Sequence, residues 1–183
     1  MKKIILSLLV VVGLTANAQM FKNKKEGSSI HFLSKSPLED IEATNKSPIA
    51  VYKVETGDLQ FAVVMTQFKF KAALMEEHFN ENYVESEKFP QAIFKGKVNE
   101  KIDLTADGEH KVTVDGKMTL HGVTKDVKAE GTITKKGDEV TVHSTFKIKV
   151  ADYNIKVPSL YVQNIAEVVD VTTHAVLEPY VKK

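Results

Sequence analysis

Apolar and polar residues alternate with a period of two over most of the chain, which is the pattern of half-buried β-strands. The stretch HKVTVDGKMTL (110–120) places Val112, Val114, Met118 and Leu120 on one side. Similar alternation occurs in GDLQFAVVMTQFKF (57–70), DVKAEGTIT (126–134), EVTVHSTFKIKV (139–150) and VDVTTHAVLEPYV (169–181). Short glycine-containing turns such as HGVT and KKGD separate these runs. The spacing predicts an all-β protein, an antiparallel up-and-down, lipocalin-like barrel of about eight strands.

In the run 57–70, the apolar residues switch from one face of the strand to the other. Apolar residues follow one face up to Met65, whereas Phe68 and Phe70 have the opposite parity. A bulge or a change of face is therefore expected near Thr66 and Gln67.

A single segment has helical rather than strand periodicity. Leu74, Met75, His78 and Phe79 recur at spacings of three and four, with acidic residues between them. This pattern predicts one short amphipathic helix near residues 71–82. Inside an antiparallel meander, such a helix is expected to cover or plug one end of the barrel.

The interior of a barrel of this size is either filled by side chains or wide enough for one small ligand, and alternation does not distinguish the two cases. A packed core and a ligand-binding lumen therefore both stay open at this point. If the lumen binds a ligand, the candidate lining residues are Phe61, Val63, Met65, Phe68, Phe70, Leu74, Met75, Phe79, Phe94, Met118, Leu120, Phe146 and Ile148.

The first residues have the layout of a secretory signal peptide. Lys2 and Lys3 precede a short apolar run, and Ala16-Asn17-Ala18 forms a small-residue cleavage site. The apolar run is shorter than the ~20 residues that a membrane span needs. Cleavage near Ala18 and a location in the periplasm or outside the cell are expected, and we expect no membrane-spanning segment.

Removal of residues 1–18 leaves 165 residues, which is enough for one domain with a sizeable core. The polar stretch 19–28 is expected to be a flexible mature N-terminus, and 29–183 to form a single barrel domain. A homodimer is left open.

Composition narrows the choice of partner. The mature chain carries 23 lysines against 24 acidic residues, so nucleic acid is not expected as a partner. The chain contains no Arg, so no guanidinium fork is present to bind a diphosphate or carboxylate head group. It contains no Cys either, which excludes disulfides and a lipid anchor on cysteine.

Three groups of residues carry a family resemblance. The sequence resembles the YceI-like family from about Ser29 to Val181. The matching residues are Gly116, Leu120, His121, Gly122, Val123, Thr124 and Lys125, then Glu85, Ser86, Pro90 and Phe94, and finally Asp152, Tyr153 and Ile155. The resemblance implies a lipocalin-like barrel that is exported to the periplasm. It also implies binding of a long isoprenoid or another amphiphilic lipid, such as a quinone or a fatty acid, without catalysis and without a cofactor.

The histidines raise alternatives to lipid binding. His121 precedes a glycine and is expected at a hairpin corner, bonded to nearby backbone; with His78 and Tyr153 it is also a candidate rim residue for a polar head group. The helix lacks a second histidine four residues from His78, so no metal site is expected. No catalytic motif is present, and a hydrolase that uses His78 or His121 is the less favoured reading. A protein-binding module with a packed lumen is the main alternative.

Overall fold

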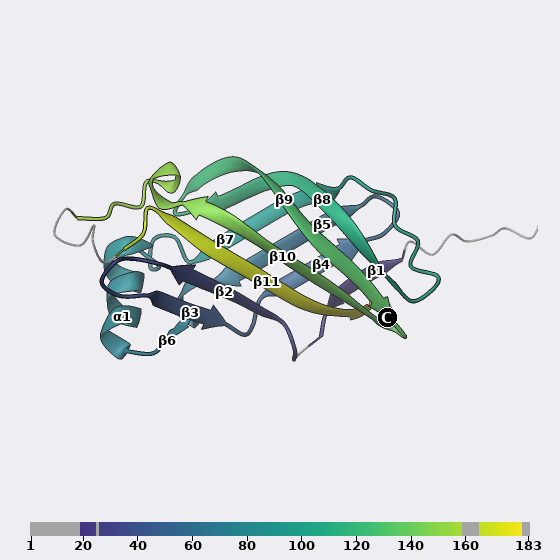
Figure 1. Ribbon diagram of the computed structural model, residues 1–183, viewed down its shortest axis with the longest axis horizontal. Coiled ribbons are helices and arrows are strands. Elements are labelled where there is room, and N and C mark those ends of the chain that lie inside the picture. The colour runs from purple at the N-terminus through teal and green to yellow at the C-terminus, as the bar shows by residue number, and fades with distance from the viewer. Residues whose placement is uncertain (1–18, 25, 159–164, 181–183) are drawn as a thin grey trace, which may run out of the picture.

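Eight passes of the chain run antiparallel to one another and close into a barrel (Figure 1). The computed structural model describes residues 19–24, 26–158 and 165–180. The strands are β1 (Met20–Asn23), β2 (Ser29–Ser34), β3 (Ile41–Asn45), β4 (Ile49–Lys53), β5 (Asp58–Val64), β6 (Lys69–Phe70), β7 (Gln91–Val98), β8 (Gly108–Leu120), β9 (Val123–Lys136), β10 (Glu139–Lys149) and β11 (Val168–Pro179). The predicted all-β antiparallel barrel of about eight strands is confirmed.

The eleven strands fill eight positions in the barrel wall, which we call passes. Three of the passes consist of two short strands separated by a break. β1 and β2 both pair with β11, β3 and β4 form the next pass, and β5 and β6 form the third. The third pass is interrupted by the 3₁₀ turn η1 (Met65–Gln67), where the sequence predicted a change of face. After the second break, Asn23 binds the start of β4: its Nδ2 donates to the Pro48 carbonyl at 3.0 Å, and its Oδ1 accepts from the Ala50 N–H at 3.1 Å.

The N-terminal segment differs from its expected flexibility. Met20–Asn23 forms β1, which pairs with β4 on one side and with β11 on the other and so closes the barrel. Phe21 is fully buried. A four-residue strand with one apolar anchor is too short to produce a readable alternation, which is why the sequence did not predict it. The expected signal peptide lies outside the described residues.

The predicted hairpin corner at His121 is present. β8 and β9 pair up to Leu120 and Val123, and a two-residue turn connects them. His121 and Gly122 both have positive φ, of 50° and 73°. This is the backbone of a type I′ turn, whose twist matches that of the flanking strands.

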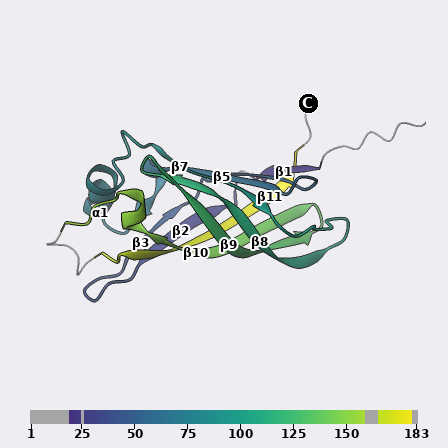
Figure 2. The same cartoon turned by 90° about the horizontal axis from the view of Figure 1, so that it is seen from above.

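The predicted short helix lies at one end of the barrel's long axis (Figures 1 and 2). It comprises α1 (Ala73–His78) and a π-helical turn, η2 (Phe79–Tyr83), which continues it. The predicted helix near residues 71–82 is thus confirmed, with both ends within two residues. We call this the helix end of the barrel. At the same end, a second short turn, η3 (Val150–Tyr153), packs against β9 and β10.

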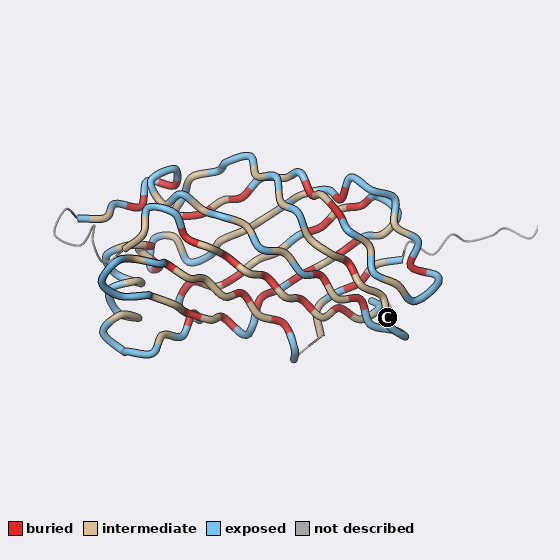
Figure 3. Tube along the Cα trace, viewed as in Figure 1, coloured by how far each residue is buried: buried red, intermediate tan, exposed pale blue. Residues whose placement is uncertain are grey.

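The barrel interior is divided into two halves. Buried positions alternate along the strands (Figure 3), as the sequence pattern requires. At the end opposite the helix, a packed cluster is filled by side chains that include Phe21, Tyr52, Ile133 and Leu177, all with 1% or less of their surface exposed. The half nearer the helix is lined by a second set of apolar side chains and contains cavities.

Candidate ligand-binding cavity

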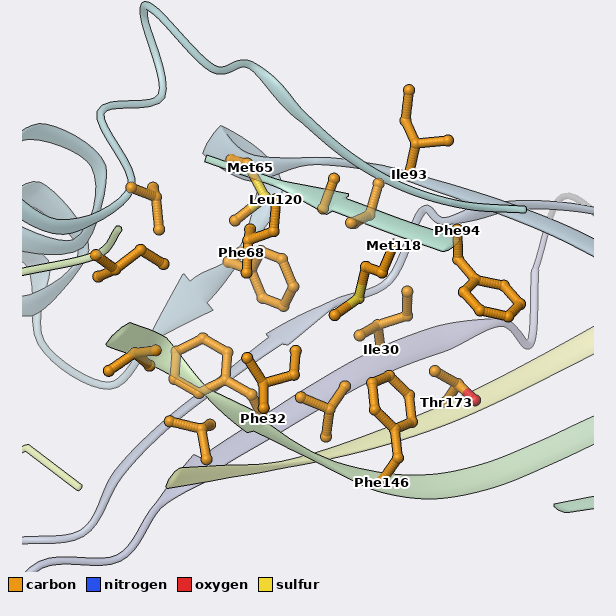
Figure 4. Close-up of a pocket in the computed structure, with 18 of the residues that line it drawn as sticks. Ile30, Phe32, Met65, Phe68, Ile93, Phe94, Met118, Leu120, Phe146 and Thr173 are labelled. Carbon is orange, nitrogen blue, oxygen red and sulfur yellow. The ribbon is translucent and has the colours of Figure 1, made fainter. Parts of the chain in front are cut away.

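The inner cavity lies within the barrel, in the half nearer the helix, and has a volume of about 160 Å³. Side chains from β2, β5, β7, β8, β10 and β11 converge on it (Figure 4). Thr173 is the one polar residue among the described residues that line it. Strand alternation explains this, because every second residue of each strand points inward. A space with so little polar surface is suited to a hydrocarbon rather than to a polar metabolite.

An outer cavity of about 320 Å³ continues from the inner one toward α1. Six residues line both cavities: Phe32, Phe79, Val84, Val150, Ile155 and Val169. The lining of the outer cavity includes polar side chains: Ser34, Glu39, His78 and Tyr83. Leu74, which also lines it, is 60% exposed, so the outer cavity reaches solvent. The two cavities together give an apolar interior with a more polar mouth.

Four phenylalanine rings surround the junction of the two cavities. Phe32 stacks on Phe79 with ring centroids 5.5 Å apart, and Phe70 lies 5.0 Å from Phe79. Phe68 lies 5.6 Å from Phe32. These rings come from three separate segments, because Phe68 directly precedes β6, so the aromatic collar also ties η2 to β2 and β6. Such offset and edge contacts are the favoured arrangement of aromatic pairs.

One part of the cavity wall lacks a backbone ladder. β9 and β10 pair as far as Gly131 and Ser144. Nearer the helix end, residues 123–130 pair only with β8 and residues 145–149 only with β11. Side chains and η3 therefore close this side of the barrel, which is the least hydrogen-bonded part of the cavity wall.

The thirteen candidate lining residues all border an internal space. Those on the inner cavity are Val63, Met65, Phe68, Phe79, Phe94, Met118, Leu120, Phe146 and Ile148. Those on the outer cavity are Phe70, Leu74 and Met75, together with Phe79. Phe61 lies deeper, beside a small void of about 60 Å³. Whether they bind a ligand stays a prediction.

Sequence reasoning missed the contribution of β2 and β11. Ile30, Phe32, Val169 and Val171 line the inner cavity. Alternation in β2 was visible, but a six-residue strand does not reveal which parity faces inward. In β11 the alternation places Val169 and Val171 on one face, but only its pairing with β10 and β2 turns that face toward the lumen.

His121 and Tyr153 occupy a different position from the expected rim. Neither lines the inner or the outer cavity. His121 Nδ1 lies 2.9 Å from the Tyr153 carbonyl oxygen, and Nε2 lies 2.6 Å from Glu85 Oε2. Each ring nitrogen thus has its own hydrogen-bonding partner. His121 therefore connects three segments: the β8–β9 hairpin, the loop at Glu85 and η3.

The surroundings of this histidine explain its geometry. The hydrogen bond from His121 holds the pKa of Glu85 below its usual value, and the charges of Lys88 and Lys156 act in the same direction. Phe89 packs on the imidazole with ring centroids 4.5 Å apart. Burial raises the pKa of Tyr153, and the charge of Asp152 adds to this. This arrangement is a structural latch, since both nitrogens of His121 are occupied.

Among the described residues that line the inner and outer cavities, His78 is the one histidine. Across the described ranges, no group of three or more His, Asp or Glu side chains is placed to hold a metal ion.

The fold and the cavity define a class of protein: a closed antiparallel barrel with an enclosed apolar space and a helix at its mouth. The model of the YceI-like domain matches residues 21–177, so the chain belongs to the YceI-like family. Comparison with curated protein sequences finds no match.

Solved structures of similar fold are distant in sequence. A polyisoprenoid-binding domain from Saccharophagus degradans, implicated in plant cell wall breakdown, is 15% identical, with a TM-score of 0.75 over 87% of this chain and 98% of that one. BcnA of Burkholderia cenocepacia is 20% identical, with a TM-score of 0.69 over 81% and 95%. The YCEI protein of Campylobacter jejuni is 16% identical, with a TM-score of 0.55 over 81% and 86%. At these identities the likeness shows the fold alone.

Among the described residues, no helix has the length and apolar character needed to cross a membrane.

Proposed function

We propose that this protein binds one amphiphilic lipid, with the hydrocarbon chain in the inner cavity and the polar head in the outer cavity. The observation that carries this proposal is the continuity of the two cavities through shared apolar walls, with Thr173 as the one polar residue on the inner wall. Burial of about ten methylenes at ~0.8 kcal/mol each gives ~8 kcal/mol before ordering costs, which corresponds to micromolar binding. The name of the relative from S. degradans, a polyisoprenoid-binding domain, supports a ligand of this class.

The outer cavity favours a neutral head group over a diphosphate. Its described lining residues include no Lys, and the sequence contains no Arg. Glu39 on the same wall disfavours an anion. A hydroxyl or a carbonyl could instead exchange hydrogen bonds with Ser34 or His78. A prenol, a quinone or an uncharged fatty acyl compound fits these groups better than a phosphorylated isoprenoid.

We also propose a cellular setting. The signal-peptide pattern of residues 1–18 supports export to the periplasm or the exterior. The exported part is a single domain that comprises residues 29–183 and also β1. The role is that of a carrier or reservoir rather than a catalyst. A protein-binding module with a packed lumen is less favoured, because the half of the barrel nearer the helix is not filled.

Native mass spectrometry of the purified protein tests lipid binding directly. We expect a mass increment that disappears on organic extraction, and identification of the extract gives the head group and chain. In Phe146→Lys, a charge enters the inner cavity, so the increment should be lost because an unpaired ammonium is costly in an apolar space.

The matched control is Thr145→Lys, which adds the same charge at the adjacent, exposed position. Circular dichroism establishes that both variants are folded. An unchanged lipid content in folded Phe146→Lys, or no increment in the wild type after incubation with prenols, quinones and fatty acids, would contradict the proposal.

A further inference from the structure

The deep end of the inner cavity is closed by two aromatic side chains. Phe94 of β7 and Phe146 of β10 line both the inner cavity and the smaller void of about 60 Å³ beyond it. Thr173 is the third residue common to the two spaces. In Figure 4 these three residues lie at the side of the cavity away from Met65 and Phe68. The two rings therefore form a floor between the inner cavity and the packed half of the barrel.

Two glycines hold the ring of Phe94 in this position. Gly96 and Gly116 face each other across the β7–β8 pair. A Cβ placed on Gly96 would lie 2.5 Å from Phe94 Cζ, and one placed on Gly116 would lie 2.7 Å from the same atom. Any larger residue at either position would displace the ring, so the glycines form a slot in which it lies against the barrel wall.

Beyond this floor, the barrel is occupied by its own side chains. Val112, Val114 and Val142 border the small void and belong to the packed cluster. A hydrocarbon chain that enters from the helix end can thus extend as far as Phe94 and no farther. Between the floor and the packed cluster, space remains for only a short extension.

We propose that Phe94, positioned by Gly96 and Gly116, sets the depth of the lumen and thereby the longest hydrocarbon chain that fits fully inside. This inference rests on the proposed lipid-binding function. It assigns chain-length selection to the floor, whereas head-group selection belongs to the outer cavity.

A homologous series of straight-chain primary alcohols tests this, with dissociation constants measured by displacement of a fluorescent alkyl probe. In the wild type, each added methylene should tighten binding about fourfold until the chain reaches the floor, after which affinity should stop rising. The chain length at this break is the measured quantity.

Phe94→Ala should move the break to longer alcohols, because it joins the inner cavity to the small void. Gly96→Ala should move the break to shorter ones. Gly96 lies farther from the helix end than Phe94, so its new methyl group would push the ring back into the inner cavity. Phe94→Leu is a milder change and should move the break to longer alcohols by less than Phe94→Ala does. It replaces the other variants in the test if either of them does not fold.

Leu177→Ala is the control. Leu177 is buried in the packed cluster and lines neither of the two cavities nor the small void. Its truncation should therefore lower stability without changing the alcohol length at which affinity stops rising. If the wild type shows a break and folded Phe94→Ala and Phe94→Leu keep it at the same length, the assignment to Phe94 is overturned while lipid binding stands. If the wild type binds none of the alcohols and none of the lipids named above, both proposals fail.

Discussion

At the residue scale, the latch of His121 shows how one imidazole can organise three segments that are distant in sequence. Its side chain is 9% exposed, and its two ring nitrogens bond to Tyr153 and Glu85 at the same time. Val84 and Val150, which line both cavities, are close in sequence to these two partners. The latch therefore stabilises the loop and the turn that form the mouth of the cavity.

His121→Ala should lower the free energy of unfolding by about 1–3 kcal/mol, because it leaves the carbonyl of buried Tyr153 without its partner. Urea unfolding monitored by circular dichroism measures this. His110→Ala changes a half-buried histidine at the start of β8, away from both cavities, and it should cost much less. An equal loss in the free energy of unfolding for the two variants would mean that the hydrogen bonds of His121 do not stabilise the fold.

The pairing of Glu85 with His121 should make stability depend on pH. The pKa of Glu85 is lower in the folded state than its ordinary value of 4.5, so the folded state favours the carboxylate. The contribution to stability is present above pH 4.5 and is lost as the pH falls through the lowered folded pKa.

Glu85→Gln should abolish this part of the acid dependence, as measured by urea midpoints across the acidic range. Glu87→Gln is the control, since Glu87 is an exposed carboxylate two residues farther along the same loop. An acid dependence in Glu85→Gln equal to that in Glu87→Gln would refute the assignment.

At the element scale, β1 closes the barrel, although it has only four residues. It pairs with β4 and β11, and it places Phe21 in the packed cluster. Without β1, the edges of β4 and β11 at this end would be unpaired, and an exposed strand edge is a site for aggregation.

Phe21→Ala should destabilise the protein by about 3–5 kcal/mol, as expected for removal of a fully buried aromatic side chain. Chemical denaturation measures the loss. Lys22→Ala on the same strand removes an exposed side chain and should change stability by less than about 0.5 kcal/mol. Similar values for the two variants would mean that β1 is not part of the folded wall in solution.

The elements also differ in how far their inward faces were predictable. In β8, a regular alternation correctly assigned Val112, Val114, Met118 and Leu120 to the interior. The helix was predictable for the same reason, since its period differs from that of the strands around it. β1 was not, because four residues are too few to show a pattern.

At the scale of the whole molecule, stability and ligand binding should be linked. The packed cluster supports the barrel at one end, whereas the other end keeps an unfilled interior that costs dispersion contacts. A ligand that fills this space binds the folded state and not the unfolded chain, so it raises the free energy of unfolding.

A straight-chain alcohol at 100 times its dissociation constant should stabilise the protein by about 2.7 kcal/mol, seen as a rise in the melting temperature that depends on ligand concentration. Phe146→Lys should show no rise, and Thr145→Lys should respond as the wild type does. A melting temperature that does not change with alcohol concentration in the wild type would argue against an accessible cavity.

The amino-acid sequence by itself determined the class of fold, the single helix and the hairpin corner at His121, because these depend on local periodicity and on backbone conformations that nearby residues favour. It also placed the candidate lining residues on inward positions. Only the tertiary structure decided that the barrel is filled at one end and hollow at the other. It also decided that β1 closes the wall, that His121 bonds to Glu85 and Tyr153, and that Phe94 lies across the lumen in a slot made by two glycines. These features arise from contacts between segments far apart along the chain, and the volume that remains between packed side chains is not encoded in the alternation of any one strand.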